Sequence, residues 1–312
     1  MTPRYRGSPI PMVVAITVAA CGGSTTGGRT QSPAPASDPR TVAAELLATD
    51  SGFAAAGRDL PVVEALAPML ADDVEMPAPG GFIMGRDSVL KTLKANPLNT
   101  TAHFHWTPVR VGVSADGRQG FTFGYGSVVS GDSTATPLKY LAYWVKGSGG
   151  WHAVAYKRGR ASGPADPSPM DAALPPNLVA AETDPAMIEA FRQSLDTAER
   201  AFSRDAQQIG LQAAFARYGR PDAVNMGGPA RAAFVVGADS IGAAVSQDEP
   251  DSGSSVSWAP DRVIVASSGD LGVTIGTIVA NQPDSAGTAA KFPFFTVWRR
   301  DGIDEPWRYV AE

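Results

Sequence analysis

The three histidines are the side chains whose type first suggests chemistry: His103, His105 and His152. His103 and His105 are two residues apart, so on a β-strand both would point to the same face. Such a pair could bind a transition metal. The sequence offers no third ligand at a recognisable spacing and no Gly-rich phosphate loop. We therefore expect the histidines to lie on the surface or at a rim, with no metal and no cofactor.

Acidic residues are the second group that could do chemistry. Asp73 and Glu75 fall in a short strand-like segment, where alternation places them opposite Val74 and Met76. This pattern favours solvent or the rim of a pocket for the two acids. A carboxylate beside a histidine and a tyrosine could still move protons. Glu75, His105 and Tyr125 are therefore the weak candidates for catalysis.

Aromatic side chains alternate along two predicted strands. A face of this kind could line an apolar pocket, or it could be ordinary sheet core. Both interpretations stay open, because the same face of a curved sheet can be part of the core and also the wall of a pocket. The candidate pocket residues are Phe121, Phe123, Tyr125, Tyr140 and Trp144.

An internal repeat indicates the elements that would position these side chains. Three blocks recur at an offset of 152 residues, and one of them begins with tryptophan in both copies. The sequence thus predicts one module written twice, at residues 39–158 and 184–312, with a linker at 159–183. The blocks are Phe82–Val89 with Phe234–Ile241, Trp106–Val111 with Trp258–Val263, and Gly120–Gly124 with Gly272–Gly276.

Each copy predicts the same order of elements: two helices, a strand, a third helix and four antiparallel strands. In the second copy, Asp184 is a suitable N-cap and Pro185 a suitable first-turn residue. Apolar residues then follow at spacings of three and four. The third helix is expected after the Gly-x-Asp-Ser signal, capped by Asp87 or Ser88 and by Asp239 or Ser240.

This order, with Gly85–Val89, Thr296–Arg300 and Trp307–Tyr309, resembles the nuclear-transport-factor-2-like superfamily, in its SnoaL-like and polyketide-cyclase-like branch. The resemblance implies an α+β chain of two tandem cone-shaped domains, each a curved antiparallel sheet wrapped around about three helices. Members include isomerases, dehydratases, epoxide hydrolases and modules with no known reaction. The family's catalytic residues do not map onto this sequence. A non-catalytic binding or interaction module is therefore expected; the alternative is an isomerase, cyclase or hydrolase acting on an apolar molecule in the first copy.

The N-terminal segment resembles that of a bacterial lipoprotein. Arg4 and Arg6 precede an apolar stretch, residues 11–20, that is too short to span a bilayer. Val18-Ala-Ala-Cys21 then resembles a lipobox, and Cys21 is the chain's single cysteine. We expect a signal peptide at 1–20, acylation of Cys21 and a flexible tether at 21–38. The alternative is an ordinary signal peptide with a chance cysteine.

The net charge of the chain limits which binding partners can be expected. Removing Arg4 and Arg6 with the signal leaves 24 basic against 31 acidic residues, so nucleic-acid binding has little electrostatic support. The expected partners are a membrane through Cys21 and an apolar small molecule or an envelope protein. The two copies could also pack as an intramolecular pseudo-dimer. Gly22 after the cysteine, in place of Asp, indicates the outer membrane facing the periplasm if the cell is Gram-negative.

Overall fold

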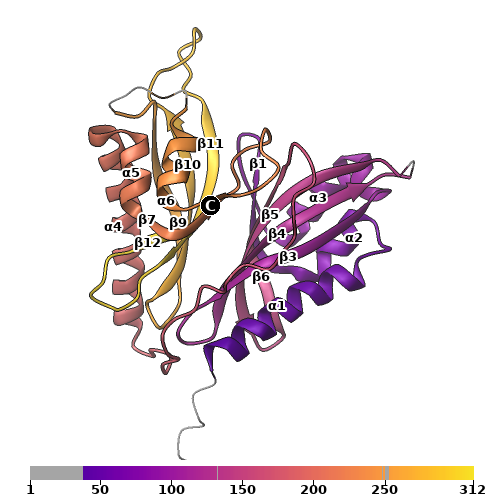
Figure 1. Cartoon of the computed structure of the whole chain (residues 1–312), viewed down its shortest axis with the longest axis horizontal. Helices are drawn as coiled ribbons and strands as arrows, with labels where there is room; N and C mark the ends of the chain where they lie inside the picture. The colour runs from indigo at the N-terminus through magenta and orange to yellow at the C-terminus, as the bar shows by residue number, and fades with distance from the viewer. Residues whose placement is uncertain (1–37, 132, 248, 250–252) are drawn as a thin grey trace, which may run out of the picture. The chain divides into compact units, whose positions relative to one another are not determined.

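Two six-stranded sheets with the same strand order form the framework of the computed structural model (Figure 1). It describes residues 38–312 except 132, 248 and 250–252, so the predicted signal peptide, Cys21 and most of the tether lie outside the described residues. The sheet orders are β2-β1-β6-β5-β4-β3 and β8-β7-β12-β11-β10-β9. The predicted fold class, α+β with two sheets that each pack against helices, is confirmed.

The first module runs from the first helix to the sixth strand. Short 3₁₀ helices at Ala67–Met69 and Pro97–Thr100 join some of its elements. The elements are α1 (Pro39–Ala56), α2 (Val62–Leu66), β1 (Leu70–Ala78), β2 (Gly81–Met84), α3 (Arg86–Ala95), β3 (His103–Val113), β4 (Gln119–Val129), β5 (Ala135–Gly147) and β6 (Gly150–Arg160).

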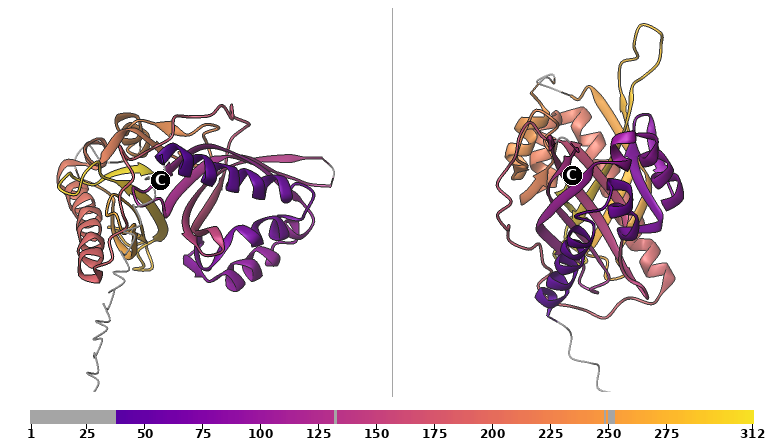
Figure 2. Two further views of the ribbon diagram at one scale, coloured as in Figure 1. Left: turned by 90° about the horizontal axis from the view of Figure 1, so that it is seen from below. Right: turned by 90° about the vertical axis from the view of Figure 1, so that its right-hand side faces the viewer.

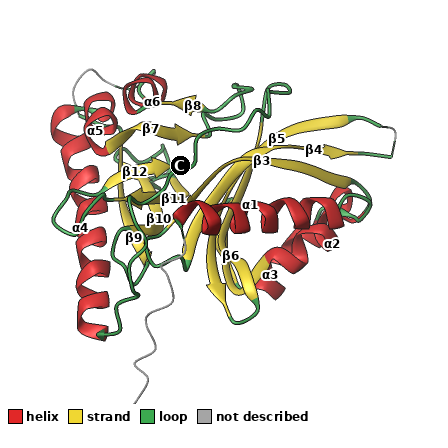
Figure 3. Ribbon diagram, turned by 60° about the horizontal axis from the view of Figure 1, so that its bottom comes forward, coloured by secondary structure: helices red, strands yellow, loops and turns green. Residues whose placement is uncertain are grey.

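The second module repeats this order, as the colouring by element type shows (Figure 3). Among the described residues, no helix of either module is long and apolar enough to cross a membrane. The elements are α4 (Pro185–Ile209), α5 (Leu211–Tyr218), β7 (Gly219–Asn225), β8 (Val235–Val236), α6 (Ala238–Val245), β9 (Val256–Val265), β10 (Leu271–Ala280), β11 (Lys291–Arg299) and β12 (Arg308–Ala311).

The predicted N-cap of α4 is confirmed, whereas those of α3 and α6 are not. The Asp184 side chain accepts a hydrogen bond from the Ala186 N–H, as predicted for an N-cap. The predicted caps of the third helices are wrong, because α3 and α6 begin directly after Gly85 and Gly237. These glycines have φ of 85° and 92°, a conformation that a residue with a Cβ adopts only under strain. The glycine of the repeated signal is therefore the residue that starts the helix.

Each sheet closes by pairing its first long strand with its last. β1 pairs with β6 and β7 with β12, and both pairs are parallel. The sheets are thus mixed, whereas the family resemblance implied antiparallel sheets throughout. The remaining neighbours are antiparallel, including the four-strand meanders that were predicted.

Repeated glycines let the long helices lie close to the sheets. A Cβ on Gly120 would stand 2.5 Å from Leu46 Cδ2 of α1, and a Cβ on Gly272 would stand 2.5 Å from Leu195 Cδ2 of α4. These distances are far inside van der Waals contact, so each long helix requires a glycine beneath it. Helices α1–α3 and α4–α6 cover one face of their own sheets (Figure 2). The opposite faces form a shared apolar cluster that includes Phe123, Ile275 and Phe295.

Candidate functional site

Each module buries one carboxylate from its long helix beneath a repeated tryptophan. In the first module, Asp50 accepts hydrogen bonds from Trp106 Nε1 at 2.8 Å and from the Tyr140 hydroxyl at 2.6 Å. In the second, Glu199 accepts from Trp258 Nε1 at 2.6 Å, Trp298 Nε1 at 2.8 Å and Thr274 Oγ1 at 2.5 Å. Both carboxylates are almost wholly buried. A buried carboxylate is tolerated only when such donors replace water.

The sequence carried a signal for this pair that our prediction missed. Leu46, Asp50 and Phe53 recur as Leu195, Glu199 and Phe202 at an offset of 149 residues. In each copy the acid falls within the apolar stripe of the helix, at i+4 from leucine. An acid inside such a stripe indicates a buried polar contact, since burial without a partner would be costly.

The buried carboxylate of the second module borders a large cavity. This cavity of about 550 Å³ lies between α4, α5 and the second sheet, and Glu199 lines it. Its apolar wall includes Phe202, Leu211, Phe215, Trp258, Ile278 and Phe294. Its polar groups come from Glu199, Glu312, Asn225, Thr296 and Lys157, the last reaching across from β6 of the first module.

A second carboxylate, Glu312, lies in the same cavity. It accepts hydrogen bonds from Asn225 Nδ2 at 3.0 Å and from Thr296 Oγ1 at 3.3 Å. The Lys157 ammonium donates to the Phe295 carbonyl at 3.1 Å and lies 4.5 Å from the centre of the Phe295 ring. The cavity therefore combines apolar walls with two acids and one amine.

Burial shifts the ionisation of all three groups. Burial raises the pKa of Glu199 to about 7, against the opposing effect of its three donors. Burial also raises the pKa of Glu312, opposed first by the charge of Lys157. The pKa of Lys157 is lowered to about 8 by burial, and the Glu312 charge opposes that shift. Burial thus favours the uncharged form of all three groups.

Aromatic side chains fill the interior of the first module, where a pocket was predicted. The repeat aligns Tyr140 with Phe294 and Tyr156 with Glu312. Both tyrosines are 1% exposed, with ring centres 6.4 Å apart, and Trp144 is fully buried. Tyr140 and Trp144 are thus core residues of the first module.

The other predicted pocket residues face away from that interior. Phe121 and Phe123 are buried in the cluster shared with the second module. Phe123 and Tyr125 contact Phe234 with ring centres 4.7 and 5.0 Å apart. The alternation along β4 was predicted correctly, but a neighbouring module covers that face.

The three weak catalytic candidates do not meet as one site. Glu75 is 4% exposed, where the alternation favoured solvent or the rim of a pocket, because it forms an ion pair with Arg262 of the second module at 2.6 Å. His105 and Tyr125 line a different pocket, of about 600 Å³, in which His105 Nε2 lies 3.1 Å from the Arg58 carbonyl oxygen. Across residues 38–312, gaps aside, no three His, Cys, Asp or Glu side chains cluster as metal ligands would.

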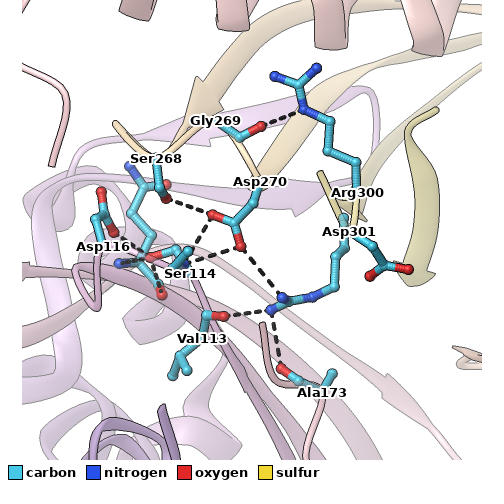
Figure 4. A network of polar contacts seen from close by, with 12 residues as sticks. Val113, Ser114, Asp116, Ala173, Ser268, Gly269, Asp270, Arg300 and Asp301 are labelled. Carbon is cyan, nitrogen blue, oxygen red and sulfur yellow. Dashed lines mark hydrogen bonds and ion pairs between the residues drawn. The ribbon is translucent and has the colours of Figure 1, made fainter. Parts of the chain in front are cut away.

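A polar network joins the two modules (Figure 4). Arg299 of β11 is 1% exposed and donates to the carbonyls of Val113 and Ala173. Its charge is balanced by Asp270, 3.4 Å away, which also accepts from the Ala115 N–H at 3.0 Å. Arg110 of β3 likewise pairs with Asp222 of β7. These contacts fix which face of the first sheet the second module covers.

Comparison with known proteins finds solved structures that match part of this chain at low identity. No family model matches the chain, and no curated protein matches it. A ketosteroid isomerase-like protein from Erwinia carotovora is 17% identical, with a TM-score of 0.30; the match covers 40% of this chain and 97% of that one. A nuclear-transport-factor-2-like protein of unknown function from Pseudomonas putida is 14% identical, with a TM-score of 0.32, over 39% and 87% of the two chains. Identities this low bear on the fold alone, so the chemistry of the site depends on this chain's own residues.

Proposed function

We propose that this chain is a lipid-anchored envelope protein of the nuclear-transport-factor-2-like superfamily whose second module binds a small, largely apolar molecule. The main support for this proposal is the 550 Å³ cavity, in which apolar walls surround Glu199, Glu312 and Lys157. Apolar walls supply binding energy, and a few fixed polar groups orient a ligand. The molecule that fits this chemistry has a hydrocarbon body and one polar group.

The hydrogen bonds that Glu199 already accepts favour binding over catalysis. Its two oxygens already accept from two indoles and one hydroxyl, so the carboxylate is fixed within the protein's own network. Glu312 favours the alternative, acid–base catalysis in this same cavity. It accepts from two neutral groups, and burial raises its pKa, against the opposing charge of Lys157.

The binding proposal is tested by a thermal-shift screen of the full chain with medium-chain alcohols, ketones and aromatic hydrocarbons. A ligand present at a hundred times its Kd stabilises by about 2.7 kcal/mol, which raises Tm by several degrees. Met226→Trp, which places a larger side chain in the cavity wall, should abolish the shift. Met187→Trp, at an exposed position on α4, is the matched control and should retain it. A shift that persists in Met226→Trp, or no shift with any compound, contradicts the proposal.

The anchor has a separate test. Cys21→Ser removes the only thiol that can be acylated, so the exported chain should leave the membrane fraction and appear in the soluble fraction. Its thermal unfolding should match that of the wild type, because Cys21 precedes both modules in the sequence. Fractionation after export measures the first result and calorimetry the second. A Cys21→Ser chain that stayed with the membrane would show that Cys21 is not the anchor.

A further inference from the structure

Lys157 belongs to the first module, yet its amine lies in the cavity of the second. It is the one amino group among the described residues that line this cavity. An ammonium has three N–H donors, and among the described residues Nζ uses one of them, toward the Phe295 carbonyl. A ligand in the cavity can therefore reach the nitrogen.

Burial is what favours an uncharged amine at Lys157, since Met226 and Phe294 line the same cavity. Burial lowers the pKa of Lys157 to about 8, so that roughly a tenth of the amine is neutral at pH 7. The Phe295 ring, 4.5 Å from Nζ, and the Glu312 charge oppose this shift because both favour the ammonium. A desolvated lysine in an apolar pocket is the usual form of a nucleophilic amine.

We propose that Lys157 captures an apolar aldehyde or ketone in this cavity as an imine, with Glu312 as the acid that releases water. This inference rests on the proposed function and names the polar group of the ligand as a carbonyl. Two features carry it: the amine that reaches the cavity with unused donors, and the carboxyl group of Glu312 in the same wall. A carbonyl suits the site because its carbon is the atom that a nucleophilic amine attacks.

The step balances within the protein and its ligand. The Nζ lone pair attacks the carbonyl carbon, a C–N bond forms, and a proton passes from nitrogen to oxygen to give a carbinolamine. The protonated Glu312 carboxyl then donates to the hydroxyl group, the C–O bond breaks and water leaves as the C=N bond forms. The resulting iminium loses its proton to Glu312, so the net change is amine plus carbonyl to imine plus water. No oxidant or reductant is needed.

Reductive trapping tests the inference on the full chain. Decanal and cyanoborohydride at pH 7 should add one decyl group to Lys157, mapped by mass spectrometry, at least about tenfold faster than to Lys146. Lys146 is partly exposed and paired with Glu45, and serves as the internal reference. Lys157→Arg keeps a donor for the Phe295 carbonyl and should lose the adduct, whereas Lys146→Arg should keep it. Should Lys157→Arg fail to fold, protection of wild-type Lys157 by decan-1-ol replaces that arm.

The outcomes separate the two proposals. Fast labelling of Lys157 that decan-1-ol suppresses supports imine capture in the cavity. Equal labelling of Lys157 and Lys146 overturns it, even where decan-1-ol raises Tm and the binding proposal stands. If neither decanal nor decan-1-ol binds and labelling is equal, then the proposed function fails together with this inference.

Discussion

Asp270→Asn should lower the free energy of unfolding by about 3–5 kcal/mol, a large share of the stability of an ordinary domain. The change removes the carboxylate that balances Arg299, which is 1% exposed where the modules meet. The guanidinium cannot lose its proton at ordinary pH, so its charge would stay buried with carbonyl partners alone. The loss is measured by urea unfolding followed by tryptophan fluorescence.

Two further variants show whether burial is the cause. Asp301→Asn, at an exposed acid that pairs with Arg220, should cost less than about 1 kcal/mol. Asp270→Asn combined with Arg299→Met should recover much of the loss, because the unpaired charge is then gone. An Asp270→Asn chain no less stable than Asp301→Asn would show that Arg299 does not depend on this partner.

Glu199→Gln should flatten the dependence of stability on pH between about 4.5 and 7. The pKa of Glu199 rises from 4.5 to about 7 on folding, so the folded chain binds this proton more tightly than the unfolded chain does. That contribution to stability is complete below pH 4.5 and is lost as the pH rises through 7. The wild type should therefore lose on the order of 3 kcal/mol over this range from Glu199 alone. Glutamine carries no such proton, so the variant lacks this loss.

Wild type and Glu199→Gln are compared by how steeply the free energy of unfolding changes with pH, and not by its absolute value. Glutamine presents an NH₂ group where Trp298 Nε1 and Thr274 donate, so the variant also loses about 1–3 kcal/mol at every pH. Glu305→Gln, at an exposed acid, is the matched control and should retain the wild-type curve. Parallel curves for wild type and Glu199→Gln would mean that Glu199 does not keep its proton near neutral pH. Urea unfolding at half-unit pH intervals resolves the difference.

The repeat was sufficient to predict the architecture. Offsets of 152 residues aligned tryptophans and glycines, and both sheets have the order that this duplication implies. Periodicity predicted α4 and its Asp184 cap because both depend on neighbouring residues. The parallel closure of β1 on β6 could not be read from the sequence, since alternation identifies a strand and not its partner.

The site was harder to predict because each strand has two faces. Alternation grouped Phe121, Phe123 and Tyr125 correctly, but which face becomes a pocket depends on what covers the other. Glu75 was predicted to face solvent or the rim of a pocket, because nothing in its own strand indicates that Arg262 of the second module would cover it. Lys157 enters the second cavity only through the packing of two modules. Asp50 and Glu199 were different, since acids within an apolar helix stripe could have been recognised from sequence.

The pairing of first and last strands in each sheet has a consequence for folding kinetics. Leu70 of β1 pairs beside Ala153 of β6, and Val224 of β7 pairs beside Ala311 of β12. Each closure joins segments separated by most of a module, and such non-local contacts slow folding because a long loop must be ordered first. Neither sheet can close before its last strand has been synthesised. A chain stopped before β12 would leave the edge of β7 unpaired and open to association with other strands.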